Sequence, residues 1–372
     1  MNAHSNTEIS DAVAIQDLKV SAYTIPTSSP ESDGTIKWNS TTLILAEISA
    51  GDKKGIGYTY ASPATATLIE HSLKEVVTGM NCMNIPEINT KLTRHIRNEG
   101  TCGIAMMAVS AIDNALWDLK AKLLEIPLCE LLGMTTDKML IYGSGGFTSY
   151  SKEQLQKQFS GWSDEGIKNV KMKIGRKPVK DVERVHQARE AIGDDVNLFV
   201  DANGAYTEKF AVEKGYQFAQ YDVSWFEEPV SSDNLKGLRF IRENIHPSIS
   251  IAAGEYGYNI WYFRKMLEAK AVDILQADAT RCGGISGFLK AGYLAESFQV
   301  PFSSHCAPAL HLHAALALPS FYIAEYFYDH VRIEKMLFDG VSPPSGGYLK
   351  PDLSRPGLGL EFKYKDAEKY KL

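Results

Sequence analysis

Charged and imidazole side chains recur at nearly regular intervals through the second half of this 372-residue chain. The series runs from Lys171 and Lys173 through Asp201, Asn203, Glu227, Glu255, Asp278 and His305 to Glu325. From Lys173 onward, with Asn203 left out, the steps are 28, 26, 28, 23, 27 and 20 residues. Each step is long enough for one strand and one helix. In a parallel barrel the carboxyl ends of all strands face the same way, so we expect these side chains to share one pocket.

Three of the acids, Asp201, Glu227 and Glu255, end consecutive predicted strands. Each one alone could cap a helix, because acids are common where helices begin. Three carboxylates that converge on one pocket would repel one another strongly at low effective dielectric. A divalent cation removes this repulsion, and an all-oxygen ligand set suits Mg²⁺ or Mn²⁺ better than zinc. We therefore predict a Mg²⁺ site, with Mn²⁺ as the alternative ion.

Lys171 and Lys173 lie two residues apart on a predicted strand, so their side chains point to the same face. Two neighbouring ammonium groups lower each other's pKa, and a nearby metal ion acts in the same direction. A lysine whose pKa falls toward neutrality can serve as a general base. An ordinary solvated pair is the alternative, but inward lysines on a barrel strand are difficult to explain by structure alone.

His305 follows one predicted strand and Asp278 ends the strand before it. This placement lets Asp278 accept a hydrogen bond from one ring nitrogen, which would fix the tautomer and raise the basicity of the imidazole. The pattern predicts His305 as an acid or base and Asp278 as the group that orients it.

Four other residues near this series are given no catalytic role: Glu228 is predicted to be structural, and His311 and His313 to be structural or rim residues. Strand alternation directs Glu228 away from the barrel interior. Cys306 is expected to point away from His305, and a thiol nucleophile there has no further support. His311 and His313 lie two apart in a predicted helix, where they do not face each other as a zinc pair would.

The elements that must position these groups are short β-prone runs that alternate with helical stretches after residue 138. The runs cover residues 140–144, 169–174, 196–201, 223–228, 249–255, 272–278, 300–304 and 321–325. Strands that alternate with helices indicate parallel βαβ units, and eight strands fit a (β/α) barrel. A doubly wound open sheet is the alternative, but the early glycine cluster at 143–146 lacks the GxGxxG pattern.

The first part of the chain reads as a separate α+β unit. Residues 41–50 are apolar and β-prone, and residues 51–55 are a turn signal. Residues 26–39 read as a polar loop that carries Trp38. Residues 103–124 show apolar positions at spacings of three and four, which predicts a long amphipathic helix.

Composition excludes several classes of protein. Hydrophobic residues make up 44% of the chain and the formal net charge is -6, so a disordered chain or a nucleic-acid binder is not expected. The five cysteines are scattered and form no CxxC pair, which indicates reduced thiols. No apolar run reaches the roughly 20 residues that a membrane helix needs, and the start lacks a signal-peptide pattern. We expect a cytoplasmic protein that binds neither membrane nor nucleic acid.

As an ordered set, these motifs resemble the enolase superfamily, mandelate racemase subgroup. The similarity rests on residues 171–173 (KMK), 200–203 (VDAN), 225–229 (WFEEP), 254–255 (GE), Asp278 with Gly283-Gly284, 304–305 (SH) and Glu325. It implies an α/β fold, a modified TIM barrel of the (β/α)7β type with an N-terminal α+β capping domain. We accordingly divide the chain into a flexible tail (1–14), a cap (15–138), a barrel (139–334) and a segment that returns to the cap (335–372).

The resemblance also implies roles for individual residues. Asp201, Glu227 and Glu255 would bind an essential Mg²⁺, which stabilises the enediolate formed when a carboxylate substrate loses its α-proton. Superfamily members use a Lys or His base with Mg²⁺ for this reaction. Lys173 is similar to the base on one face, and His305 with Asp278 to the acid/base on the other. The substrate would be contacted by Lys171 and Glu325 at its carboxylate (Glu325 as a hydrogen-bond donor), by Asn203 at its oxygens, and by Arg281 in a role left open.

The reaction expected by family analogy is dehydration of an acid sugar to a 2-keto-3-deoxy acid. Racemisation or epimerisation, and cycloisomerisation of a lactone, use the same Lys173 and His305 pair and stay open. A non-catalytic binding protein is the remaining alternative. Specificity is expected from two cap loops, residues 26–39 with Trp38 and residues 58–66 with Tyr58 and Tyr60. The partner expected is a small carboxylate, and the protein is expected to form a homo-oligomer.

Overall fold

The computed structural model describes residues 13–372, so most of the predicted tail, 1–14, lies outside the described residues. The chain begins with a three-stranded antiparallel sheet in the order β1 (Asp17–Ser32), β2 (Lys37–Ala50) and β3 (Lys53–Tyr60). The expected loop at 26–39 is wrong, because β1 and β2 continue as a long hairpin through most of it. Their pairing shifts register between Pro26 and Glu31, and only residues 33–36 lie outside both strands.

Helices cover one face of this sheet. They are α1 (Ala64–Leu68), the π-helix η1 (Ile69–Leu73), α2 (Lys74–Val77), α3 (Ile85–His95), α4 (Ile104–Leu123) and α5 (Leu128–Leu132). The predicted long helix is α4, and it packs directly on β3. A Cβ at Gly57 would lie 2.3 Å from the carbonyl oxygen of Ala111, so only glycine permits this approach. The sheet and its helices form the predicted α+β cap.

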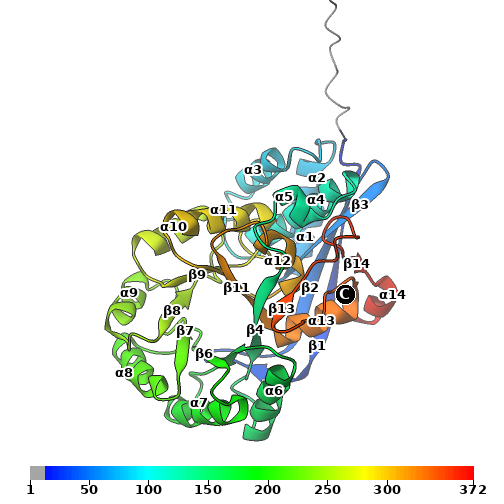
Figure 1. The fold of residues 1–372 in the computed structure, drawn as a ribbon. Helices are drawn as coiled ribbons and strands as arrows, with labels where there is room; N and C mark the ends of the chain where they lie inside the picture. The colour runs from blue at the N-terminus through cyan, green and yellow to red at the C-terminus, as the bar shows by residue number, and fades with distance from the viewer. Residues whose placement is uncertain (1–12) are drawn as a thin grey trace, which may run out of the picture.

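Eight parallel strands follow and close into a barrel, as the residue spacing predicts (Figure 1). They are β4 (Met139–Gly145), β5 (Asn169–Lys173), β6 (Asn197–Asp201), β7 (Val223–Glu227), β8 (Ser250–Ala253), β9 (Ile274–Ala277), β10 (Phe302–Ser304) and β11 (Phe321–Phe327). Pairing of β11 with β4 closes the ring. Every predicted strand run overlaps one of these strands.

The helices of the barrel lie outside the strands, as Figure 1 shows. They are α6 (Lys152–Asp164), α7 (Pro178–Ile192), α8 (Glu208–Ala219), α9 (Leu235–Asn244), α10 (Ile260–Glu268), α11 (Gly284–Ser297), α12 (Pro308–Ala315) and α13 (Tyr328–Leu337). Inside the barrel, Tyr142, Phe199 and Trp225 pack with Ile274 and Ile323 in one apolar cluster. This packed layer closes the barrel interior and leaves its carboxyl end as the place for a site.

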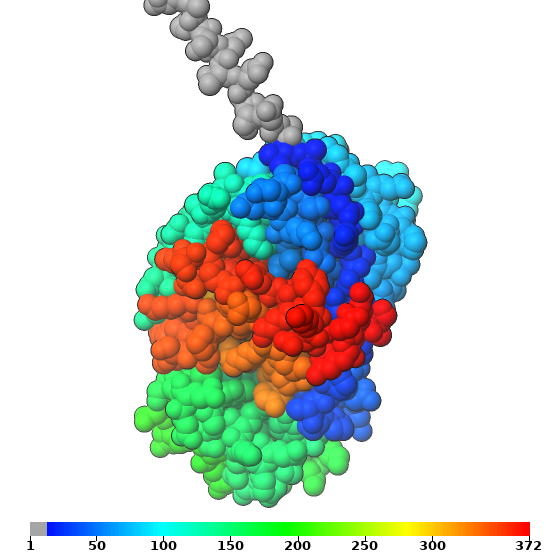
Figure 2. Space-filling model, turned by 90° about the vertical axis from the view of Figure 1, so that its right-hand side faces the viewer, coloured from blue at the N-terminus to red at the C-terminus, as the bar shows by residue number. Residues whose placement is uncertain are grey.

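The C-terminal segment runs back to the cap. Its elements are β12 (Phe338–Asp339), β13 (Tyr348–Leu349), β14 (Glu361–Phe362), α14 (Tyr364–Ala367) and the 3-10 helix η2 (Glu368–Tyr370). The backbone N–H of Leu372 donates to the carbonyl of Ala22 at 3.0 Å, and Figure 2 shows the end of the chain (red) against the N-terminal strands (blue). Among the described residues, no helix is long and apolar enough to cross a membrane.

Candidate active site

The carboxyl ends of the barrel strands bring the predicted residues into one cluster. Lys171 and Lys173 lie on β5, Asp201 ends β6 and Glu227 ends β7. Glu255, Asp278 and His305 follow β8, β9 and β10, and Glu325 lies within β11. The side chains of all eight are buried or nearly so, and salt-bridge distances connect each of them to at least one other, Glu325 for example to Lys171 at 2.9 Å. The expected single cluster is therefore present.

Asp201, Glu227 and Glu255 form a group suited to a cation. One carboxylate oxygen from each lies within 4.8 Å of the others, and all three residues are buried. Oε2 of Glu255 is buried and has no hydrogen-bond partner. Burial, together with the carboxylates of Asp201 and Glu325, raises the pKa of Glu227 despite the ammonium of Lys171. An all-oxygen set with an unpaired buried acceptor fits Mg²⁺.

The two lysines do not behave as their spacing predicted. Nζ of Lys173 donates to Oδ2 of Asp201 at 2.5 Å, and Nζ of Lys171 donates to Oε1 of Glu227 at 2.6 Å. Burial disfavours the charge on Lys173, but the carboxylates of Asp201, Glu255 and Glu325 together outweigh it and hold the pKa above its ordinary value. The expected lowering of the lysine pKa is wrong. Each ammonium lies within hydrogen-bond distance of a carboxylate, which the prediction from the lysine spacing did not include.

Lys171 is fully enclosed. Burial opposes its charge, yet the carboxylates of Glu227 and Glu325 hold its pKa well above the ordinary value. Its ammonium also lies over the ring of Tyr142, 5.1 Å from the centroid. Lys171 is absent from the wall of the pocket described below, so its contact with a substrate carboxylate stays a prediction.

His305 and Asp278 form the expected pair. Nδ1 of His305 lies 2.8 Å from Oδ2 of Asp278, and the other oxygen of Asp278 accepts a hydrogen bond from the N–H of Thr280 at 2.7 Å. Burial opposes the charge on Asp278, but the hydrogen bond with His305 and nearby cations hold its pKa well below the usual range. An ionised Asp278 fixes the imidazole so that Nε2 faces the site.

Glu325 accepts two hydrogen bonds besides its ion pair with Lys171. Ser144 donates to Oε1 at 2.6 Å, and the backbone N–H of Cys306 donates to Oε2 at 2.8 Å. Burial opposes its charge, but Lys171 and His305 hold its pKa well below the ordinary value. The expected donor role needs a protonated carboxyl, so it does not fit this arrangement. Ser144 ends the first predicted strand run, so the same strand-end pattern could have found it.

The cluster opens into a pocket of about 380 Å³ between barrel and cap. Its walls include Lys173, Asn203, Glu255, Arg281, His305, Trp38, Tyr60 and His330. Four of the predicted substrate contacts, at Trp38, Tyr60, Asn203 and Arg281, are thus in place to meet a ligand. Tyr58 is not: it is fully buried, and its hydroxyl donates to Glu334 on α13 at 2.6 Å. That expectation is wrong, because residues 58–60 continue β3 and Tyr58 lies deep in the cap–barrel junction.

Two further expectations fail for a common reason. Sγ of Cys306 lies 3.2 Å from Nε2 of His305 and does not point away from it. Glu228 is buried on the same side as the predicted metal ligands Asp201, Glu227 and Glu255. Burial and the carboxylate of Glu255 raise its pKa. Both residues have positive φ, 51° at Cys306 and 38° at Glu228. The alternation of side chains along a strand ends at such positions, so it predicts the direction of neither side chain.

The two helical histidines lie outside the pocket wall and contact backbone, as predicted. Nε2 of His311 accepts a hydrogen bond from the N–H of Ala279 at 2.8 Å. Nδ1 of His313 accepts one from the N–H of Cys129 at 3.2 Å. Gln276, which the sequence argument missed, donates to Oε2 of Glu227 at 2.9 Å. It lies two residues before Asp278, so alternation along β9 could have placed it on the inner face.

Residues 154–367 match the family described as Enolase C-terminal domain-like, and residues 20–133 match the Mandelate racemase / muconate lactonizing enzyme N-terminal domain. The chain belongs to the enolase superfamily, in its mandelate racemase group. The resemblance inferred from the strand-end motifs is therefore confirmed, as is the capped barrel.

Enolase-superfamily proteins of known structure or activity align along nearly the whole chain. The crystal structure of a mandelate racemase/muconate lactonizing enzyme-like protein from Rubrobacter xylanophilus is 49% identical, with a TM-score of 0.95 over 96% of this chain and 100% of that one. Arabinonate dehydratase from Saccharolobus solfataricus is 32% identical over 88% of this chain and 90% of its own.

L-talarate/galactarate dehydratase from Salmonella typhimurium LT2, solved with Mg and L-lyxarohydroxamate, is 29% identical with a TM-score of 0.90. That alignment covers 100% of this chain and 96% of the dehydratase. The relatives named as dehydratases identify the chain as an enzyme of this superfamily. These relatives act on acid sugars, and one of them was solved with magnesium.

Proposed function

We propose that this protein is a Mg²⁺-dependent acid-sugar dehydratase. It would remove the α-proton of a hydroxylated carboxylate and eliminate the β-hydroxyl to give a 2-keto-3-deoxy acid. The observation that carries the proposal is one pocket whose wall holds Lys173 from β5 and His305 from the β10 end, beside three clustered carboxylates. Relatives that dehydrate sugar acids support the choice of reaction.

Asp201, Glu227 and Glu255 would hold the ion, with Mn²⁺ as a substitute for Mg²⁺. When bound, the ion would offset the negative charge of the enediolate and draw the charge of Asp201 away from Lys173. Stabilising charge is needed because the α-proton of a carboxylate is a very weak acid. Gln276 and Trp225 keep Glu227 in position, since their side-chain N–H groups donate to its Oε2 at 2.9 and 3.0 Å.

Lys173 would take the α-proton on one face of the substrate. Its ammonium carries one hydrogen bond, to Asp201, and it borders the pocket. Lys171 and Glu325 lie behind the pocket wall. Their ion pair, at 2.9 Å, keeps both side chains charged and fixed in position. Proton transfer by a side chain within hydrogen-bond reach of the substrate proton contributes about 10²–10⁴-fold to a rate.

His305 would act on the opposite side as the acid that protonates the leaving hydroxyl. Asp278 engages Nδ1, which leaves Nε2 to face the pocket. Exchange of one proton between Lys173 and His305 across the α-carbon would instead give an epimerase, and the same pair could serve a cycloisomerase. The proposal favours dehydration on the strength of the relatives.

The test is a screen of purified protein against mono- and dicarboxylic sugar acids, with and without Mg²⁺, and in D₂O. A 2-keto acid product supports the proposal, whereas α-proton exchange without a keto product indicates an epimerase and overturns dehydration. Glu227→Gln and His305→Asn should each lower kcat by at least about 10²-fold. Asp195→Asn, at an exposed acid in the turn between α7 and β6, is the matched control and should retain full activity. Full activity in metal-stripped protein would refute the Mg²⁺ assignment.

A further inference from the structure

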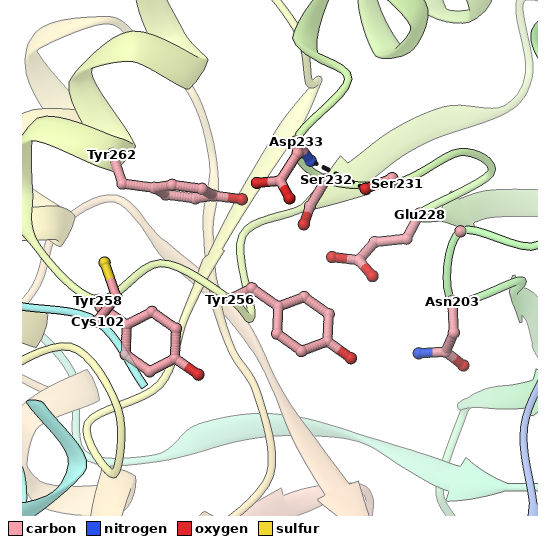
Figure 3. Close-up of a pocket in the computed structure, with 10 residues that line it drawn as sticks. Cys102, Asn203, Glu228, Ser231, Ser232, Asp233, Tyr256, Tyr258 and Tyr262 are labelled. Carbon is pink, nitrogen blue, oxygen red and sulfur yellow. Dashed lines mark hydrogen bonds between the residues drawn. The ribbon is translucent and has the colours of Figure 1, made fainter. Parts of the chain in front are cut away.

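A second chamber adjoins the reaction pocket. It has a volume of about 470 Å³ and shares Asn203 and Tyr256 with that pocket. Its other walls include Glu228 and Ser232 from the loop after β7, Tyr258 from the loop after β8, and Tyr262 from α10. Figure 3 shows the carboxylate of Glu228 and the hydroxyl of Tyr262 directed toward the middle of the chamber, and the hydroxyl of Tyr256 directed toward the side of Asn203. A substrate held at Lys173 could therefore extend into this chamber.

Several buried polar atoms here have no hydrogen-bond partner. They are Oε1 of Glu228, Oδ1 of Asn203 and the hydroxyl of Tyr262. Glu228 as a whole is only 2% exposed. Carboxylate and amide oxygens accept hydrogen bonds, so the groups they lack are donors. A sugar hydroxyl supplies such a donor, whereas an ionised carboxylate has none to give.

The charges around the chamber point the same way. Among the described residues that line it there is no lysine, arginine or histidine, while Glu228 and the exposed Asp233 are both acidic. In the adjoining pocket, Lys173 is paired with Asp201, and Arg281 lies 3.4 Å from Glu255 and 3.7 Å from Asp278. A second carboxylate on the substrate would meet acids here without a free cation to pair with.

We propose that the chamber next to Asn203 and Glu228 receives the uncharged, hydroxylated far end of the substrate, so that the enzyme selects monocarboxylic over dicarboxylic sugar acids. This inference rests on the proposed function, because it names the substrate class of the same site. Selection has two sources. Hydroxyls satisfy the unpaired acceptors, and a far carboxylate is repelled by the exposed Asp233 and meets no cation among the described residues of the chamber wall.

The first experiment compares two six-carbon acids of identical configuration that differ only at the far carbon, a primary alcohol in one and a carboxylate in the other. The Mg²⁺-loaded enzyme should show a kcat/KM at least about tenfold higher for the monoacid. Binding is measured in parallel by calorimetry with Lys173→Ala, which blocks proton removal. Equal values for the two acids, or a preference for the diacid, overturn the inference.

Two variants test the chamber itself. Asp233→Lys adds a cation at its rim and should shift the kcat/KM ratio toward the diacid by about tenfold; Asp195→Lys, at an exposed acid elsewhere, should leave the ratio unchanged. Tyr262→Phe should raise KM for the six-carbon monoacid but not for the shortest monoacid turned over. Tyr326→Phe is its matched control, since that hydroxyl is also buried without a partner but lines neither cavity.

The two proposals fail in different ways. If the monoacid binds selectively but undergoes neither α-proton exchange nor dehydration, the proposed function is wrong and the chamber assignment stands. If dehydration to a 2-keto acid is as fast for the diacid as for the monoacid, the chamber assignment is wrong and the proposed function stands. Binding of neither acid to the Mg²⁺-loaded protein overturns both.

Discussion

The thiol of Cys306 lies 3.2 Å from Nε2 of His305, the imidazole nitrogen that Asp278 leaves free. Burial raises the pKa of this thiol well above its ordinary value, so it stays protonated and can donate to Nε2. Cys306 therefore occupies the hydrogen-bonding position at Nε2 that His305 would use to protonate a substrate. A bound substrate must displace this contact before His305 can protonate a leaving group.

Cys306→Ser should lower kcat/KM about two- to tenfold, because a hydroxyl donates to Nε2 more strongly than a thiol and competes better with substrate. Cys306→Ala removes the competing donor and should leave kcat/KM unchanged or raise it. Steady-state kinetics on the preferred sugar acid measures both. The opposite order, with alanine slower than serine, would show that the thiol assists His305 and does not compete for it.

The residue spacing predicted the barrel and most of the cluster because one strand and one helix occupy a nearly constant length of chain. Asp201, Glu227 and His305 could therefore be assigned to one end of the barrel without any structure. The pairing of His305 with Asp278 followed from their adjacent strands. These inferences depend only on the repeat and on the common direction of parallel strands.

What the sequence could not predict depends on backbone geometry and on distant contacts. Glu228 and Cys306 sit at positive φ, where the strand has ended and alternation no longer applies. Tyr58 is buried, and its hydroxyl donates to Glu334, which lies 276 residues further along the chain. Residues 26–39 carry two prolines and many polar groups, a loop-like composition, yet they lie mainly within a long hairpin whose register shift accommodates them.

Asp118 on α4 should be important for joining the cap to the C-terminal segment. Its carboxylate is fully buried and accepts from the N–H groups of Ile56 at 2.8 Å and Leu358 at 2.7 Å, and from Lys122 at 2.6 Å. Asp118→Ala leaves two buried N–H groups without partners and should lower the free energy of unfolding by about 3 kcal/mol. Denaturant melts measure this loss. The exposed Asp195→Ala is the control, and an equal effect in both variants would contradict the assignment.

His313 predicts a specific dependence of stability on pH. Burial lowers its pKa from 6.5 to about 4 in the folded protein. Above pH 6.5 the imidazole is neutral in both states and imposes no penalty. Below that value the unfolded chain binds a proton that the folded protein does not, so stability falls between pH 6.5 and 4, by up to about 3 kcal/mol.

His313→Gln keeps an acceptor for the N–H of Cys129 but does not titrate, so it should flatten this part of the stability profile. Urea unfolding at pH 7, 6, 5 and 4.5 measures the slope. His71→Gln, at an exposed histidine, should leave the slope as it is in the unmodified protein. The buried His311 and His330, whose pKa values are also lowered, contribute to the slope in both proteins, so only a slope as steep in His313→Gln as in the unmodified protein would contradict the assignment to His313.

Tyr58 and Tyr60 lie two residues apart on β3 and should respond in opposite ways to the same change. Tyr58→Phe removes a hydrogen bond of 2.6 Å to the buried Glu334, so it should lower the free energy of unfolding by about 1–2 kcal/mol while kcat/KM stays within about twofold. Tyr60 lines the reaction pocket, its hydroxyl has no partner, and its ring stacks on His330 at 3.5 Å.

Tyr60→Phe should therefore leave the unfolding free energy nearly unchanged and raise KM about two- to tenfold, because a substrate hydroxyl loses its partner. Each variant serves as the control for the other, since both lose one phenolic oxygen from the same strand. Denaturant melts and steady-state kinetics on both proteins complete the comparison. A raised KM in Tyr58→Phe with normal stability would return Tyr58 to the substrate contacts and contradict its burial in the junction of cap and barrel.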